Sequence, residues 1–411
     1  MKVHPAISPE RLNRDLADFA RIGRKEDGSI CRLALTEEDR LGRDRIVSLM
    51  KDLDMDVRVD GIGNIFGFRK GKNPELSPVM MGSHIDSVAT GGPLDGTYGV
   101  LGALEVLRTL REVELYTERP LAMGIFTNEE GVRYTPDMLG SLVHAGGLPL
   151  EEALAIRGID GSLLGEELRR IGYAGDYPCG SLRPFAFLEL HVEQGPCLDR
   201  EGLSLGAVTG VNGISWQEVT LEGEPNHAGT TPMDMRADAG LGAARLIREI
   251  RGIAESVPHQ RGTCGALNFF PNLINVVPQR AVFTVDLRNG DNELLRQAEE
   301  IFRKAAEDVA REEGLRLSRR QLVRFDPVVF DENLVRRIEK AAVFRGLSCR
   351  RISSGAGHDA QMMARICPTA MIFVPSKGGI SHNPREETEP EHLALGVQVL
   401  LDTVLSLAEE V

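Results

Sequence analysis

Four short apolar runs, separated by helical segments, constrain the fold of this chain more than any other feature. Runs that are apolar on both faces are typical of strands buried in a parallel sheet that is covered by helices. Helical periodicity marks residues 8–24, 38–54 and 94–113, and the chain ends in a further helix. Strands that alternate with helices predict an α/β layered fold. The four runs lie in the segments VMMGSHIDSV (79–88), LAMGIFTNEE (121–130), FAFLELHVEQG (185–195) and AMIFVP (370–375), and in the first three segments polar residues follow the apolar run.

A second pattern occupies residues 213–327. ISWQEVTLEG (214–223) alternates as a half-solvated strand does, and residues 237–257 form an amphipathic helix. Two strands, a long charged helix and a last strand, LRLSRRQLVRF, follow. The order β-α-β-β-α-β is that of a ferredoxin-like unit. Because 411 residues exceed the usual size of a single core, we predict a catalytic domain formed by 1–212 and 328–411, interrupted by an inserted domain at 213–327.

Composition excludes several functional classes. The net charge of −13 argues against nucleic acid as a partner, because phosphate binding needs a basic face. No apolar run approaches the roughly 20 residues that span a bilayer, and the start of the chain lacks the apolar core of a secretory signal. The six cysteines form no C-x-x-C pair, as expected of a reduced protein in the cytoplasm.

Ligand-type side chains gather where the predicted strands end. In an open α/β sheet, ligands bind outside the carboxyl ends of the strands. Each side chain alone would be read as a solvated loop acid or a hydrogen-bonded histidine. Their coincidence predicts a single polar site instead. The side chains are His84 with Asp86, Glu129 with Glu130, His191 with Glu193, His382, and Asp95 from the loop GGPLDGTYG.

Three histidines and several carboxylates form a mixed nitrogen and oxygen set that suits zinc, manganese or cobalt. Two such ions lie roughly 3.5–4 Å apart in di-metal hydrolases and share a bridging carboxylate. Asp95 is flanked by a glycine that lets the main chain come close, as a bridging ligand requires. Neighbouring Glu129 and Glu130 point in different directions, so one can bind metal while the other acts as a general base.

The motifs H-I-D, L-D-G, N-E-E-G, H-V-E-Q-G and S-H-N-P-x-E together resemble those of the M20-type di-metal amidohydrolases. FTNEEGVRY, HVEQGP, NHAGTTPMDMRADA, SGAGHDA and GGISHNPREE are more narrowly similar to the hydantoinase/carbamoylase branch. That branch holds N-carbamoyl-L-amino acid hydrolases, allantoate amidohydrolases and β-ureidopropionases. The resemblance implies an aminopeptidase-like di-metal catalytic domain with an inserted ferredoxin-like lid and dimerisation domain.

The resemblance also implies a role for each matching residue. Two divalent ions, Zn²⁺ or alternatively Mn²⁺ or Co²⁺, would be held with Asp95 as the bridge. Glu129 matches the general base, and Asp86 matches an acid that orients His84. A ligating histidine commonly donates its second N–H to such a group. The matching metal ligands are His84, Asp95, Glu130, His191 and His382.

Further matches concern the substrate and the partner subunit. His227, in the inserted domain, matches a residue that enters the partner's site in a homodimer and stabilises the oxyanion. Asn275 and Arg288 match contacts to the substrate carboxylate, a role that suits the planar fork of arginine. Gln194 and Gly357 match further substrate contacts.

The activity implied is metal-dependent hydrolysis of a linear amide C–N bond in a ureido substrate that carries a carboxylate. An N-carbamoyl-L-amino acid, allantoate and 3-ureidopropionate all remain candidates. One alternative is an aminoacylase or dipeptidase of the wider family that acts on N-acyl amino acids. A second alternative, a catalytically dead metal-binding scaffold, conflicts with the presence of Glu129 beside all five ligand-type residues.

Overall fold

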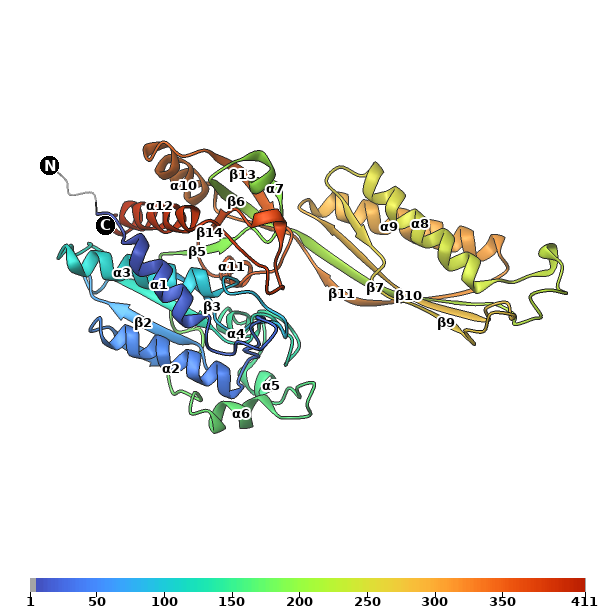
Figure 1. Ribbon diagram of the computed structural model, residues 1–411, viewed down its shortest axis with the longest axis horizontal. Helices are drawn as coiled ribbons and strands as arrows, with labels where there is room; N and C mark the ends of the chain where they lie inside the picture. Colours follow the sequence, from blue (N-terminus) through green and yellow to red (C-terminus); the bar gives the residue numbers. More distant parts are fainter. Residues whose placement is uncertain (1–4, 411) are drawn as a thin grey trace. The chain divides into compact units, whose positions relative to one another are not determined.

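The computed structural model describes residues 5–410, and the chain within it divides into two compact units. Residues 1–4, part of the stretch inspected for a secretory signal, lie outside the described residues. The first unit combines the chain up to residue 210 with the chain from residue 329, and the second unit spans residues 211–328 (Figure 1).

A nine-stranded mixed sheet organises the described part of the first unit. Its order is β1-β2-β4-β3-β5-β14-β6-β12, and β13 pairs with β6. The four central strands, β4, β3, β5 and β14, run parallel, so their carboxyl ends meet at one edge. The strands are β1 (Asp56–Val59), β2 (Ile65–Arg69), β3 (Val79–His84), β4 (Leu121–Phe126), β5 (Ala186–Val192), β6 (Leu205–Val211), β12 (Val328–Val329), β13 (Cys349–Ser354) and β14 (Thr369–Val374).

The apolar runs of the sequence become these central strands. Every residue of β3, β4, β5 and β14 is buried, which confirms the expectation of strands covered on both faces. Chain order changes direction around β3, since β4 lies on one side of it and β5 on the other. Such a switch point is where α/β sheets bind their ligands.

Helices cover this sheet. Helices α3 and α12 pack against β3 and β5, α1 packs on both helices, and α11 packs against β3, β5 and β14 (Figure 1). The helices are α1 (Pro9–Phe19), α2 (Glu37–Lys51), α3 (Thr97–Glu112), α4 (Leu139–His144), α5 (Leu150–Leu154), α6 (Leu164–Arg170), α7 (Cys197–Glu201), α10 (Glu332–Phe344), α11 (Asp359–Met363), α12 (Pro390–Ala408) and the 3₁₀ helix η2 (Lys377–Gly379).

Helix α12 is longer than the expectation that no apolar run approaches the length of a membrane span allows. By length and composition alone its 19 residues are enough to cross a membrane. However, 61% of its most apolar window is buried inside the protein, where it packs on α3, α10, β5 and β14. Most of its apolar residues therefore belong to the hydrophobic core of the first unit.

The second unit is an antiparallel sheet with two helices. Its strand order is β11-β7-β10-β8, and β9 also pairs with β10. The short strand β8 and the 3₁₀ helix η1 were not expected, whereas the other elements follow the predicted β-α-β-β-α-β order. The elements are β7 (Gly213–Glu222), η1 (Met233–Met235), α8 (Ala239–Ser256), β8 (Arg261–Thr263), β9 (Leu267–Phe270), β10 (Arg280–Asn289), α9 (Asn292–Glu312) and β11 (Arg316–Phe325).

Local sequence explains how the helices of this unit begin and pack. The side chains of Asp238 and Asp291 each accept two main-chain N–H groups at the start of α8 and α9. Leu246 on α8, Phe302 on α9 and Phe283 on β10 are fully buried and belong to one hydrophobic cluster. This unit therefore has its own hydrophobic core.

Candidate metal centre

Asp95 lies at the centre of the polar site. Its Oδ1 is 3.8 Å from Nε2 of His84 and 3.2 Å from Nε2 of His191. Its Oδ2 is 3.1 Å from Nε2 of His382, which is in turn 3.4 Å from Oε2 of Glu130. Asp95 therefore belongs to two groups of three ligand-type side chains, and the ligand atoms of each group lie within 4.8 Å of one another.

The two histidines on the strands are held in the tautomer that binds metal. Nδ1 of His84 is 2.9 Å from the main-chain oxygen of Asp86, and Nδ1 of His191 is 2.8 Å from that of Val192. A carbonyl oxygen only accepts, so each Nδ1 carries the proton. Nε2 is therefore the nitrogen that each ring presents toward Asp95, and Nε2 of His191 also lies 3.2 Å from the main-chain nitrogen of Gly96.

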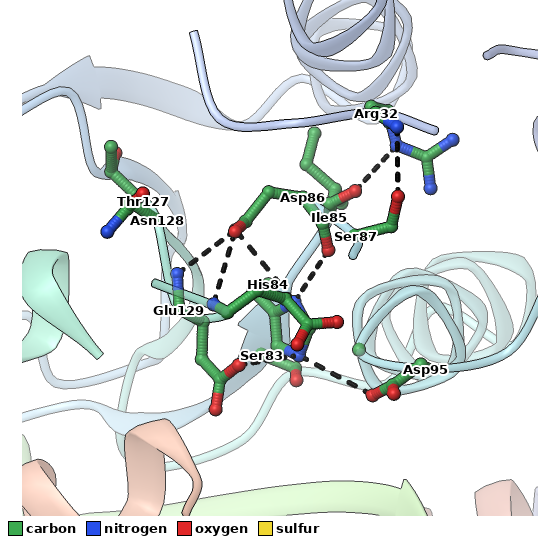
Figure 2. A network of polar contacts seen from close by, with 12 residues as sticks. Arg32, Ser83, His84, Ile85, Asp86, Ser87, Asp95, Thr127, Asn128 and Glu129 are labelled. Carbon is green, nitrogen blue, oxygen red and sulfur yellow. Dashed lines mark hydrogen bonds and ion pairs between the residues drawn. The ribbon is translucent and has the colours of Figure 1, made fainter. Parts of the chain in front are cut away.

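The carboxylate of Asp86 binds main-chain N–H groups and not the ring of His84. It was predicted to orient His84, but its Oδ1 is 3.9 Å from Nδ1 of His84, beyond hydrogen-bond range. It accepts instead from the main-chain N–H of Glu129 at 3.1 Å (Figure 2) and from that of Glu130 at 3.2 Å. Asp86 thus orients His84 through its main chain and both glutamates through its side chain.

The two adjacent glutamates point to different neighbours. Oε2 of Glu129 lies 3.4 Å from Nε2 of His84, whereas Oε2 of Glu130 faces His382. Oε1 of Glu130 is buried and has no hydrogen-bond partner among residues 5–410. A buried carboxylate oxygen without a partner is costly unless a cation meets it.

Glycine is required where the Asp95 loop turns into α3. Gly96 has φ = 62°, and a Cβ atom there would lie 2.4 Å from the ring of His84. Its main-chain N–H donates to Nε2 of His191 at 3.2 Å. The L-D-G motif therefore reflects the close approach of this loop to two histidines.

The electrostatics of the site favour a bound cation. Burial, followed by the neighbouring acids, raises the pKa of Glu129 and of Glu130 well above the ordinary value. Burial also lowers the pKa of His84 to about 4, so this ring is neutral. Burial acts in the same direction on His191, but the carboxylate of Asp95 outweighs it and raises the pKa of His191 to about 9, so a metal ion bound there would compete with a proton. Buried carboxylates that need a counter-charge, beside imidazole nitrogens, fit divalent cations of the Zn²⁺, Mn²⁺ or Co²⁺ type.

Two predicted substrate contacts also lie in the first unit. Gln194, with φ = 57°, donates from Nε2 to Oδ2 of Asp95 at 3.0 Å. Gly357 lies against Met138, whose Cε would be 3.0 Å from a Cβ atom at that position. Glu193, by contrast, lies outside the ligand groups, because its carboxylate accepts the N–H groups of Cys197 and Leu198 at the start of α7.

The remaining predicted residues lie in the second unit. His227 is exposed, and its Nδ1 accepts the N–H of Gly229 at 3.0 Å, which leaves the proton on Nε2. The segment that carries Asn275 lies beside it, since Ala228 donates to the main-chain oxygen of Asn275 at 2.9 Å. Arg288, at the end of β10, donates to Asp286 from Nε and Nη2 at 3.0 Å each.

Arg32 supports the site, although its sequence context gave no sign of this. It is fully buried, and its Nε donates to the main-chain oxygen of Ile85 at 2.5 Å. Its main-chain N–H donates to Oγ of Ser87 at 2.9 Å (Figure 2), and its Nη2 donates to Oγ1 of Thr97 at 3.0 Å. Arg32 therefore joins the loop after β3 to the start of α3.

Comparison with known proteins agrees with this geometry. Residues 80–406 match the model of peptidase family M20/M25/M40, and the chain belongs to this family. An N-carbamoyl-L-amino-acid amidohydrolase of Rhizobium meliloti is 40% identical over 404 residues, 98% of this chain and 97% of that protein. An allantoate amidohydrolase of Bacillus subtilis is 36% identical over 393 residues, 95% of each chain.

A solved structure is closely similar as well. The amidase of the hydantoinase/carbamoylase family from Burkholderia multivorans superposes with a TM-score of 0.96 at 44% identity, covering 98% of this chain and 99% of that one. The resemblance drawn from the motifs is therefore confirmed.

Proposed function

We propose that this chain is an amidohydrolase that cleaves a linear C–N bond in a ureido substrate bearing a carboxylate, with two divalent metal ions as cofactors. The observation that carries the proposal is the position of Asp95 between two histidine and carboxylate groups, with Glu129 beside them. The names of the similar proteins, which act on N-carbamoyl-L-amino acids and on allantoate, support the substrate class.

The proposed ligands are His84 and His191 for one ion, Glu130 and His382 for the other, and Asp95 for both. Ions held there would polarise the scissile carbonyl and make a water molecule more acidic. Glu129 accepts the proton of the attacking water and then returns it to the leaving nitrogen. For an N-carbamoyl amino acid, one water is consumed, and the products are the free amino acid, CO₂ and ammonia.

Residues of the second unit would bind the rest of the substrate. Arg288 and Asn275 would bind the carboxylate, and Gln194 and Gly357 of the first unit would line the site. His227 carries its proton on Nε2, the form that can donate to an oxygen that gains negative charge. We propose that the second unit is a lid and dimerisation domain, and that His227 acts in the partner subunit's site. The six cysteines form no disulfide within the described chain, which suits the cytoplasm as its location.

A matched substrate panel tests the function. We expect ammonia from allantoate or from N-carbamoyl-L-amino acids, and at least about 100-fold lower turnover of N-acetyl derivatives of the same amino acids. A site built to hydrogen-bond a terminal NH₂ discriminates strongly against an analogue that lacks it. Ureidoglycolate and 3-ureidopropionate complete the panel. Preference for N-acetyl substrates would instead support an aminoacylase.

Mixing two inactive variants tests the role of His227. His227→Ala and Glu129→Gln should each be inactive alone. After subunit exchange, a hybrid dimer would hold one site with both lesions and one with neither. Activity should return to about a quarter of wild type, because half of the dimers are hybrids and each has one intact site.

The control mixes Glu129→Gln with His382→Ala, two lesions of the same unit, which should not complement. If mass measurements prove exchange and the first pair stays inactive, His227 does not act across subunits.

A further inference from the structure

Glu386 joins two of the ligand-bearing loops and has no assigned role. It is 4% exposed, and its Oε2 accepts the main-chain N–H groups of Leu94 and Asp95 at 2.8 and 3.1 Å. Its Oε1 accepts Oγ–H of Ser381 at 2.9 Å. One side chain therefore holds the loop that carries Asp95 and the residue before His382, which lie nearly three hundred residues apart in the chain.

These contacts show that Glu386 supports the site and is not itself a metal ligand. Both carboxylate oxygens already accept protein N–H or O–H groups, and Glu386 belongs to none of the groups of ligand-type side chains found among residues 5–410. Its own main-chain N–H closes a turn with the oxygen of Asn383 at 3.0 Å. The side chain is thus fixed at its base as well as at its tip.

Gly92 provides a second, independent sign that the position of Glu386 matters. A Cβ atom at residue 92 would lie 2.3 Å from Cβ and 2.4 Å from Oε2 of Glu386. The main chain before Asp95 therefore packs directly on this side chain, and only glycine leaves room for it.

His382 needs such support more than the strand histidines do. It lies in a loop with φ = 53°, a conformation that non-glycine residues rarely adopt, and its side chain is 49% exposed. His84 and His191, by contrast, are buried at the ends of central strands. The spacing between His382 and Asp95 thus depends on the contacts that Glu386 makes.

We propose that Glu386 is a positioning residue that sets the spacing of Asp95 and His382, and thereby the affinity of the Asp95–Glu130–His382 group for its metal ion. The inference rests on the proposed di-metal function. Residues that orient metal ligands typically contribute 10–100-fold to metal affinity. The role depends on the length of the side chain and on its hydrogen bonds, and not on its charge.

Two conservative variants separate length from charge. Glu386→Gln keeps the length, and its amide can accept both N–H groups and donate to Oγ of Ser381. Glu386→Asp keeps the charge but is one methylene too short to reach both loops. The matched control is Glu387→Asp, because Glu387 is exposed and pairs only with Lys377 among the described residues.

Calorimetric titration of metal-free protein with Mn²⁺ gives the readout. Wild type, Glu387→Asp and Glu386→Gln should each bind two equivalents, with dissociation constants within about threefold of each other. Glu386→Asp should bind one equivalent normally and the second about 10–100-fold more weakly. Gly92→Ala, which displaces Glu386 without changing it, should weaken the same equivalent and serves as the test if Glu386→Asp does not fold.

The possible failures can be told apart. Wild type that binds no Mn²⁺ contradicts the proposed function. If Glu386→Asp and Gly92→Ala both bind two equivalents of Mn²⁺ with the dissociation constants of wild type, Glu386 does not have the proposed role. A weakened second equivalent in Glu386→Gln but not in Glu386→Asp overturns it too, because that pattern would make charge the determinant.

Discussion

Replacing Glu129 by Gln is expected to remove nearly all turnover while both metal ions and the fold remain. The change is almost isosteric, and the main-chain N–H of residue 129 still donates to Asp86. What is lost is the group that accepts a proton from water, and loss of a well-placed base costs about 10²–10⁴-fold in rate. Steady-state ammonia release and metal analysis of the same sample measure both halves of the expectation.

The neighbouring residue supplies the control. Glu130→Gln should lower metal affinity first, because Oε2 of Glu130 faces His382 and its Oε1 is buried without a partner among the described residues. The two variants should therefore differ: Glu129→Gln loses turnover and keeps its metal, whereas Glu130→Gln binds metal more weakly. Activity of Glu129→Gln within tenfold of wild type at normal metal content would remove Glu129 from the mechanism.

Removal of metal by a chelator is expected to abolish activity, and Mn²⁺, Co²⁺ or Zn²⁺ should restore it. Ligand sets of imidazole and carboxylate exchange these ions, and none of the ligand groups in the described chain includes a thiolate. The melting temperature should fall as well, because a ligand that binds only the folded state stabilises it by mass action. Activity assays and thermal melts before and after reloading test this.

Mg²⁺ serves as a comparison in the reloading experiment. It demands octahedral oxygen ligands and keeps its waters, so it should restore far less activity than Mn²⁺. Full activity in protein shown by elemental analysis to be metal-free would refute the metal mechanism.

The central strands could be predicted from sequence because burial on both faces leaves a continuous apolar run. Strand β13 could not, since CRRISS is half-exposed and polar. Strand β6 (LGAVTGV) could not either, because two glycines interrupt its apolar run. The ligand-type residues were visible for a related reason. Histidines and acids are rare in buried strands, so His84 and His191 stand out where β3 and β5 end.

What the sequence could not predict is how these residues are held. Main-chain carbonyl groups fix His84 and His191, and any residue type can supply a main-chain carbonyl. Glu193 has the spacing of a ligand but caps α7, because the direction of a side chain beyond a strand end depends on the following loop. Arg32 comes from a segment distant in sequence, so only the folded chain reveals its contact with Ile85.

Ammonia release during stepwise addition of Mn²⁺ to metal-free protein tests metal-dependent cleavage of a ureido C–N bond most directly. With an N-carbamoyl-L-amino acid or allantoate as substrate, we predict no ammonia before metal is added and a rise that ends at two equivalents per chain. Ammonia release from the metal-free protein, or none from either substrate at any loading, would contradict the proposed function.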